Sequence, residues 1–167
     1  TATSDMITAN PEIQVIFACN EGGTIGAAQA VKQAGLSDSV GVFGYDGSDQ
    51  ITSMIIDGSL QAAVAQDPYG QGVAAMTDLI NYLMGNPGDS VGKLTIAPGI
   101  LLSATDKEAV NTWRVNNGLE ELDIPVEEES MAPSGPMAAA DIVVAGVVFQ
   151  DDQFMKSMVQ GFQDAGK

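Results

Sequence analysis

Histidine is absent from this chain of 167 residues, and cysteine occurs once, as Cys19. One cysteine cannot form an internal disulfide, and without histidine the common zinc and non-haem iron sites cannot be built. Nucleophilic catalysis by a Ser-His or Cys-His pair is excluded for the same reason. The composition therefore predicts neither a metal site nor a histidine-dependent active site.

Positively charged residues are also few, since 6 Lys and Arg oppose 22 Asp and Glu for a net charge of −16. Such a surface repels phosphate backbones and anionic lipid, so we expect no nucleic-acid partner and no membrane-binding face. The sequence has no run of about eighteen apolar residues that could form a transmembrane helix. The hydrophobic content of 45% is nevertheless sufficient for one globular domain with a core.

The most informative stretch of the sequence covers residues 13–47. Two short apolar runs, 13–18 and 40–43, are separated by a helical segment. This pattern predicts a βαβ unit, whose parallel strands are buried on both faces. Ligands of such sheets bind just beyond the carboxyl ends of the strands. Asn20 and Asp46 follow the two predicted strands, so both are candidate ligand-binding residues.

The glycine-rich stretch after the first strand allows two interpretations. In the first, a flexible Gly-Gly turn precedes a helix that has Thr24 as its N-cap. In the second, Gly23 and Gly26 belong to a dinucleotide-binding fingerprint, with the acidic Asp46 closing the next strand about 20 residues later. The first glycine of that fingerprint is replaced by Glu21, whose carboxylate would face the pyrophosphate.

The remaining apolar periodicity up to residue 118 predicts further helices and strands. Trp113 has helical spacing with the apolar Val110, so we expect it to pack in the core and not to stack on a ligand. The predicted helices cover 1–10 (the end of a helix), 48–57, 69–84 and 105–118, the predicted strands cover 60–66 and 93–102, and 85–92 is predicted to be a surface loop.

Residues 62–68, AAVAQDP, place Gln66 at the end of a predicted strand. Together with residues 13–47, this segment resembles the type 1 periplasmic binding proteins of sugar ABC importers, the ribose-binding-like group. In that family an Asn after a strand, an Asp in a Gly-aromatic-Asp-Gly turn and a Gln closing an Ala-rich segment hydrogen-bond the sugar. The resemblance therefore implies that Asn20, Asp46 and Gln66 bind the ligand.

The composition changes at residues 119–140, which hold three prolines, many acidic residues and no periodic pattern. We expect a linker that forms a solvated tether. Residues 141–167 then restart a strand and an amphipathic helix, and they are similar to the first βα unit of the same family. That resemblance assigns Asp152 to a polar sugar contact, and Phe154 and Met155 to two positions at which the family has aromatic residues over the sugar, although glutamine replaces the usual proline before Phe154.

The resemblance implies a rearranged order of segments. Residues 1–118 correspond to the end of the second lobe with a hinge crossover and part of the first lobe, 119–140 to a linker, and 141–167 to the first βα unit of the first lobe. Such an order is expected of a circularly permuted or tandem binding protein, or of a piece of either. The chain would begin inside the second lobe, in keeping with a start that does not resemble a signal peptide. We expect a second polypeptide to complete the fold.

The fold class implied by the resemblance is α/β: a parallel-sheet βαβ sandwich that forms a Rossmann-like lobe of a type 1 periplasmic binding protein, incomplete in this chain. The implied function is the solute-binding component of an ABC importer. It binds a monosaccharide or similar polyhydroxy ligand in a cleft between two lobes and closes on it, with no enzymatic activity and no cofactor. The closed form would dock on membrane permease subunits in the periplasm or outside the cell, and the parent protein would be lipid-anchored.

Two other functions use related folds. The ligand-binding core of a LacI-like transcriptional regulator would need a basic helix-turn-helix, which the sequence lacks. An NAD(P)-binding Rossmann-type enzyme domain is disfavoured by Glu21 and by the missing histidine base, although Lys and Asp bases remain available. Asn20 and Asp46 also have an ordinary structural alternative, because Asn and Asp after strands often cap helices or satisfy turns.

Overall fold

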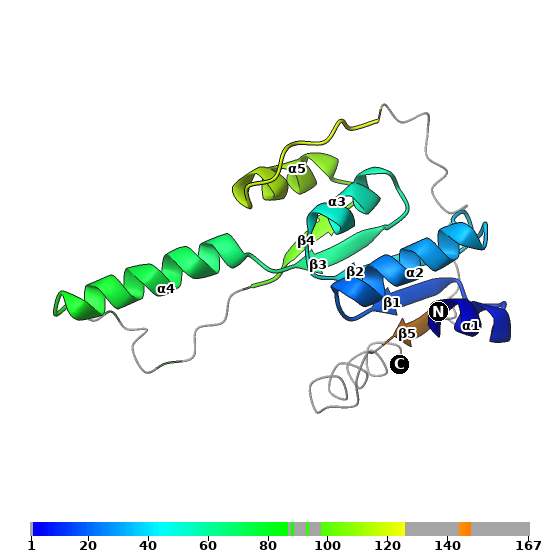
Figure 1. Ribbon diagram of the computed structural model, residues 1–167, viewed down its shortest axis with the longest axis horizontal. Helices are drawn as coiled ribbons and strands as arrows, with labels where there is room; N and C mark the ends of the chain where they lie inside the picture. The colour runs from blue at the N-terminus through cyan, green and yellow to red at the C-terminus, as the bar shows by residue number, and fades with distance from the viewer. Residues whose placement is uncertain (1, 87, 89–92, 94–97, 126–143, 148–167) are drawn as a thin grey trace.

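A computed structural model describes residues 2–86, 88, 93, 98–125 and 144–147. Within these residues, five strands form one sheet in the order β4-β3-β2-β1-β5 (Figure 1). β1 pairs in parallel with β2 and β5, β2 pairs in parallel with β3, and β4 joins β3 antiparallel. The strands are β1 (Val15–Ala18), β2 (Gly41–Tyr45), β3 (Ala62–Ala65), β4 (Ile100–Ser103) and β5 (Val144–Val147).

Five helices accompany the sheet in the described part of the chain. They are α1 (Ala2–Ala9), α2 (Glu21–Gln33), α3 (Asp49–Ile56), α4 (Pro68–Leu83) and α5 (Lys107–Asn116). The last four begin after an N-cap whose side-chain oxygen accepts a hydrogen bond from a backbone N–H of the first turn, and these caps are Asn20, Ser48, Asp67 and Asp106. The predicted α/β fold and the alternation of helices and strands from β1 to α5 are confirmed.

Thr24 does not cap α2, so this prediction was wrong. The helix begins four residues earlier, at Glu21, because Oδ1 of Asn20 accepts a hydrogen bond from the N–H of Gly23 at 2.9 Å. The predicted Gly-Gly turn is therefore part of the helix. Thr24 is fully buried, and its hydroxyl donates to the carbonyl of Asn20 at 2.8 Å and accepts from the N–H of Tyr45 at 3.1 Å. It connects α2 to the end of β2.

The core lies between the sheet and one layer of helices. In this layer α1 packs on α2, α2 on α3, and α3 on α5. Alternate strand residues point into the layer, which is the periodicity expected for strands with one buried face. The buried cluster comprises Ile13, Ile16, Ala18, Ala27, Ala28, Val31, Val40, Val42, Ile51, Ile55, Ile56, Leu60, Ala63, Ala65, Leu102, Val110 and Trp113.

The opposite face of the sheet is only partly covered, which corrects the expectation that both faces are buried. Phe17 and Phe43 are register partners on this face, and Phe43 is 36% exposed. Val64 and Leu101 pair further along, and Leu101 is 66% exposed. The reason is that the described helices which contact the sheet all belong to the other layer.

Helix α4 is separate from this core. It extends away from the sheet between the end of β3 and the return of the chain at β4 (Figure 1). None of its residues is buried. The predicted apolar face is present but uncovered, and its exposed large side chains are Tyr69, Val73, Met76, Leu79, Ile80, Tyr82 and Leu83.

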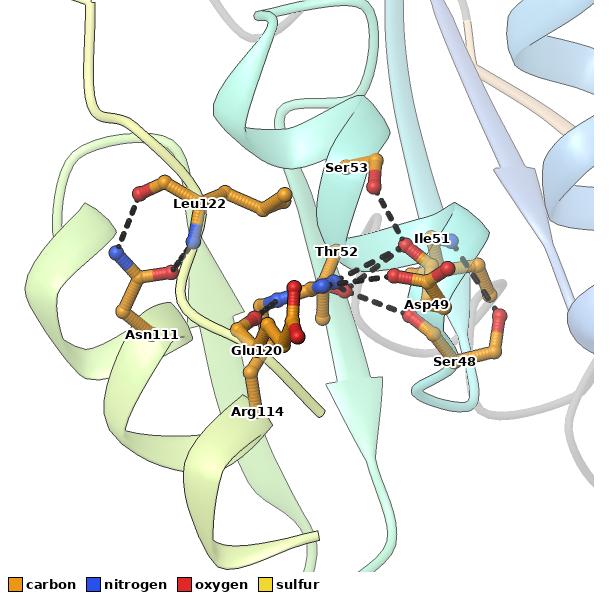
Figure 2. Close-up of polar contacts among 9 residues, drawn as sticks. All are labelled: Ser48, Asp49, Ile51, Thr52, Ser53, Asn111, Arg114, Glu120 and Leu122. Atoms are coloured by element: carbon orange, nitrogen blue, oxygen red, sulfur yellow. Dashed lines mark hydrogen bonds and ion pairs between the residues drawn. The ribbon is translucent and has the colours of Figure 1, made fainter. Parts of the chain in front are cut away.

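Arg114 of α5 forms an ion pair and hydrogen bonds with α3 (Figure 2). Its side chain is 3% exposed, and its Nη2 lies 2.7 Å from Oδ1 of Asp49. Nη1 donates to the hydroxyl of Thr52 at 2.6 Å, and Nε donates to the carbonyl of Glu120 at 2.7 Å. A buried guanidinium is tolerated here because its donors meet a carboxylate, a hydroxyl and a carbonyl.

The first residues of the predicted linker are not a free tether. Asn111 and the backbone of Leu122 exchange two hydrogen bonds, of 2.8 and 3.0 Å (Figure 2). Leu119 and Leu122 also pack against the core. Residues 126–143 and 148–167 lie outside the described residues, as do most of the predicted loop 85–92 and the start of the strand predicted at 93–102. β5 falls within the strand predicted after the linker, and the assignment of that segment to a first lobe stays a prediction.

Candidate ligand-binding site

The carboxyl ends of β1, β2 and β3 lie side by side because these neighbouring strands are parallel. Asn20 follows β1 after one intervening residue, and Asp46 and Gln66 directly follow β2 and β3. The sheet thus brings together three residues that are distant in the sequence. This edge is where open α/β sheets bind their ligands.

Asp46 is the centre of this group. Its Oδ2 accepts a hydrogen bond from the N–H of Glu21 at 3.1 Å, and its Oδ1 accepts one from Nε2 of Gln66 at 2.9 Å. Its own N–H donates to the carbonyl of Val64 at 2.9 Å. Asp46 is therefore tied to the segments that follow β1 and β3.

The backbone of Asp46 adopts φ 73°, in the left-handed region. Asp and Asn occupy this region more readily than most residues, and they do so mostly in turns and functional sites. The sharp turn ends β2 and directs the half-buried carboxylate toward Gln66. The following helix α3 is capped by Ser48, so Asp46 does not cap it and instead accepts the first N–H of α2, from Glu21.

The Asp46 carboxylate keeps capacity for a ligand. Two carboxylate oxygens offer about four acceptor positions, of which the two protein hydrogen bonds use two. The remaining positions suit two donors, such as two hydroxyl groups of a polyol. Gln66 is exposed and half-buried Asn20 uses its side-chain oxygen for the helix cap, so amide groups of both remain near this edge as donors and acceptors.

Asn20 has the capping role considered from the sequence, and its ligand-binding role stays a prediction. Its oxygen caps α2, and its position one residue before Glu21 places it beside the Asp46 carboxylate. Burial raises the pKa of the thiol of the preceding Cys19. The thiol therefore stays protonated at neutral pH and is a small apolar group beneath the site.

Sequence reasoning did not identify two groups that hold the site. One is the backbone N–H of Glu21, which a search for side chains does not reveal. The other is Trp113, which is buried as predicted but whose Nε1–H also donates to the carbonyl of Gln66 at 3.2 Å. The predicted contacts Asp152, Phe154 and Met155 lie outside the described residues.

An open hollow of about 700 Å³ lies between the start of α4 and the end of α5. It is lined by Pro68, Tyr69, Val115, Asn116, Asn117 and Gly118. Asn20, Asp46 and Gln66 do not line it, so the hydrogen-bonded group forms an open edge of the sheet and not the wall of this hollow. None of the residues that line the hollow is charged.

The residues that the structure describes contain no group of three or more His, Cys, Asp or Glu side chains that could hold a metal ion. None of their helices is both long enough and apolar enough to cross a membrane.

The parallel sheet and the polar edge define an α/β ligand-binding lobe. A family model described as a periplasmic binding protein domain matches residues 1–87. The chain belongs to this family. The resemblance noted from its sequence motifs is thereby confirmed.

Curated relatives match part of the chain. The ribose import binding protein of Escherichia coli is 41% identical over 64 residues, which are 38% of this chain and 21% of the relative. The D-allose-binding periplasmic protein of the same species is 32% identical over 78 residues, 47% of this chain and 25% of the relative. The chain thus matches only about a fifth to a quarter of the length of these relatives.

Solved structures show the same fold. A periplasmic solute-binding protein of an ABC transporter from Actinobacillus succinogenes, with bound D-allose, has a TM-score of 0.57 and 30% identity over 65% of this chain and 37% of its own. A solute-binding protein from Agrobacterium vitis, with bound D-fucose, has a TM-score of 0.55 and 28% identity over 63% of this chain and 35% of its own. These proteins are named as transport components, which supports neither the regulator nor the NAD(P)-binding enzyme.

Proposed function

We propose that this chain is part of the solute-binding component of an ABC importer, and that it supplies one side of a cleft for a monosaccharide or similar polyhydroxy ligand. The observation that carries the proposal is the Asp46 carboxylate, held by Glu21 and Gln66 at the meeting point of three parallel strands. The names of the relatives and the sugars bound in the similar structures support the same ligand class.

The chemistry of the site fits vicinal hydroxyl groups. Each sugar hydroxyl donates one hydrogen bond and accepts others, so a carboxylate beside two amides can satisfy a pair of hydroxyls. Hydrogen bonds to the charged Asp46 contribute about 1.5–3 kcal/mol each, roughly twice the contribution of neutral ones. Asp46 would therefore provide most of the polar affinity, and Asn20 and Gln66 would select the hydroxyl arrangement.

The other side of the cleft would come from a first lobe. A contiguous exposed apolar surface such as that of α4 usually marks an interface. We propose that this face of α4 packs against the remainder of the first lobe. That remainder would be provided by a second polypeptide or by further parts of the parent protein. Asp152, Phe154 and Met155, which follow β5 along the chain, would add further contacts. Residues 1–118 would then be the second-lobe end with the hinge crossover and part of the first lobe, 119–140 the linker, and 141–167 the first βα unit.

Closure of the two lobes on the sugar would sequester it and create the surface that docks on the permease subunits of the importer. The D-allose-binding relative is a periplasmic protein by name, and we propose a periplasmic or extracellular location, with a lipid anchor in the parent protein. No enzymatic step is required, because the polar edge binds hydroxyl groups without a group poised to react with them.

The test is ligand binding by the ¹⁵N-labelled chain, measured by NMR titration. D-ribose, D-allose and D-fucose are titrated first, and NAD is titrated separately. We expect at least one sugar to shift the amide signals of Glu21 and Gln66. Asp46→Ala should weaken this binding tenfold or more, which corresponds to about 1.4 kcal/mol. Asp38→Ala, an exposed carboxylate in a remote turn, is the matched control. Shifts with NAD alone, or unchanged sugar affinity in Asp46→Ala, would contradict the proposal.

A further inference from the structure

Trp113 is the single tryptophan of the chain, and it joins α5 to the polar edge of the sheet. Its side chain is buried, with 6% of the residue exposed. Its Nε1–H donates to the backbone carbonyl of Gln66 at 3.2 Å, across 47 positions of sequence. A buried indole N–H normally finds such a partner, and here the partner is the backbone of a ligand-binding residue.

The ring of Trp113 is also in close contact with the segments on both sides of the site. A Cβ added at Gly47 would lie 2.7 Å from Cζ2 of Trp113 and 2.8 Å from the Cβ of Ala65. Gly47 directly follows Asp46, and Ala65 directly precedes Gln66. The indole therefore lies against the turn that carries Asp46 and hydrogen-bonds the residue that contacts its carboxylate.

The helix that carries Trp113 is itself fixed. The next residue, Arg114, bonds Asp49 and Thr52 of α3 through its guanidinium. Since α3 starts two residues after Gly47, α5 is tied to the site through both Trp113 and Arg114. Side chains that bind a ligand keep their geometry when neighbouring groups on rigid elements support them.

We propose that Trp113 is a positioning residue of the ligand site: it orients Gln66 and, through the hydrogen bond between Gln66 and Asp46, sets the direction of the Asp46 carboxylate. The inference rests on the proposed function for the identity of the ligand, whereas the positioning of Gln66 and Asp46 by Trp113 does not depend on it. Trp113 itself does not touch the ligand, because its ring is buried beneath Gly47 and its N–H is used by Gln66.

The first arm of the test needs no ligand. In the ¹⁵N-labelled chain, we expect the two side-chain amide protons of Gln66 to be well separated and protected from exchange, because Nε2 donates to Asp46. Trp113→Phe keeps an aromatic ring but removes the donor, and it should move these signals toward those of a solvated glutamine. Val110→Ala, a buried change on the same helix, controls for loss of stability. Unchanged Gln66 signals in a folded Trp113→Phe chain would overturn the inference.

The second arm measures coupling in a double-mutant cycle with D-ribose or D-allose. Trp113→Phe should lower affinity about fivefold to tenfold, the effect of one neutral hydrogen bond. Its effect should vanish in the Gln66→Ala background and persist in the Asn20→Ala background, since only Gln66 transmits it. Equal effects in both backgrounds would contradict the inference. If no sugar binds the wild-type chain while the first arm succeeds, the proposed function fails and the positioning role stands.

Discussion

The Arg114 guanidinium lies 2.7 Å from the Asp49 carboxylate, and the two side chains differ sharply in exposure, 3% for Arg114 and 69% for Asp49. The pair therefore crosses from the interior to the surface. Its two members should not contribute equally to stability, because the buried Arg114 makes further hydrogen bonds inside the protein, to Thr52 and Glu120, whereas the exposed Asp49 is largely solvated.

Arg114→Met should lower the free energy of unfolding by about 3 kcal/mol, since it removes hydrogen bonds to Thr52 and Glu120 as well as the ion pair. Asp49→Asn should cost only about 1 kcal/mol, because an exposed carboxylate is screened by solvent and the amide oxygen can still accept a hydrogen bond. Urea unfolding of both variants tests this order. A larger loss in Asp49→Asn would show that the charge, and not the hydrogen-bond network, dominates.

Gly44 permits the close approach of α2 to β2. A Cβ at this position would clash with the buried Thr24 side chain, whose hydroxyl bonds the end of β2. Gly44→Ala should therefore lower the free energy of unfolding by about 1–3 kcal/mol, the usual range for overpacking. Gly22→Ala is the matched control, because nothing lies within 4 Å of its added Cβ and a helical Gly→Ala change stabilises by up to about 1 kcal/mol. Equal effects at both positions would refute the packing argument.

Asp57 should make stability depend on acid pH. Burial alone would raise the pKa of its carboxyl, but hydrogen bonds from Ser59 and the charge of Lys32 outweigh this effect and lower the pKa. The stabilisation is then complete above the unfolded pKa of about 3.9 and is lost as the pH falls through the lower folded value. Urea unfolding should show Asp57→Asn to be slightly less stable than wild type at pH 7, with the difference shrinking as the pH falls below about 3.9. A constant difference would exclude the linkage.

The uncovered face of α4 should make the chain associate. Val73, Met76, Ile80 and Leu83 follow helical spacing and are all exposed. We expect concentration-dependent self-association in sedimentation velocity, and a variant with glutamine at these four positions should sediment as a monomer. A control with glutamine at Thr77 and Asn81 should behave as wild type. A monomeric wild-type chain at high concentration would show that this face needs no partner.

Most of the fold follows from local patterns in the sequence. The apolar runs and their spacing predict β1 to β3 and all helices from α2 to α5, because each strand and helix has one regular apolar face. The start of α2 was misplaced because Asn20 and Thr24 are both good caps, and only the buried hydrogen bonds of Thr24 decide between them. The covering of the sheet by the described helices was overestimated because a parallel βαβ pattern does not reveal on which face each helix packs.

The candidate site likewise has a part that the sequence predicts and a part that it does not. Asn20, Asp46 and Gln66 could be placed together from sequence, because parallel neighbouring strands end at one edge. The hydrogen bond from Trp113 to Gln66 spans 47 positions and uses a backbone carbonyl, so no pattern of residue types in the sequence predicts it. The contributions of Asp152, Phe154 and Met155 remain predictions.

Ala65 and Ile100 are register partners on the antiparallel strands β3 and β4, so their Cα atoms lie about 5 Å apart. The chain thus leaves and re-enters the sheet at adjoining points, and none of the described residues between them belongs to the buried core. Segments with close ends can change length at little entropic cost. The β3 and β4 pair is therefore a natural junction for recombination, at which an insert of different size or origin can be exchanged while the sheet, its helices and the core stay the same.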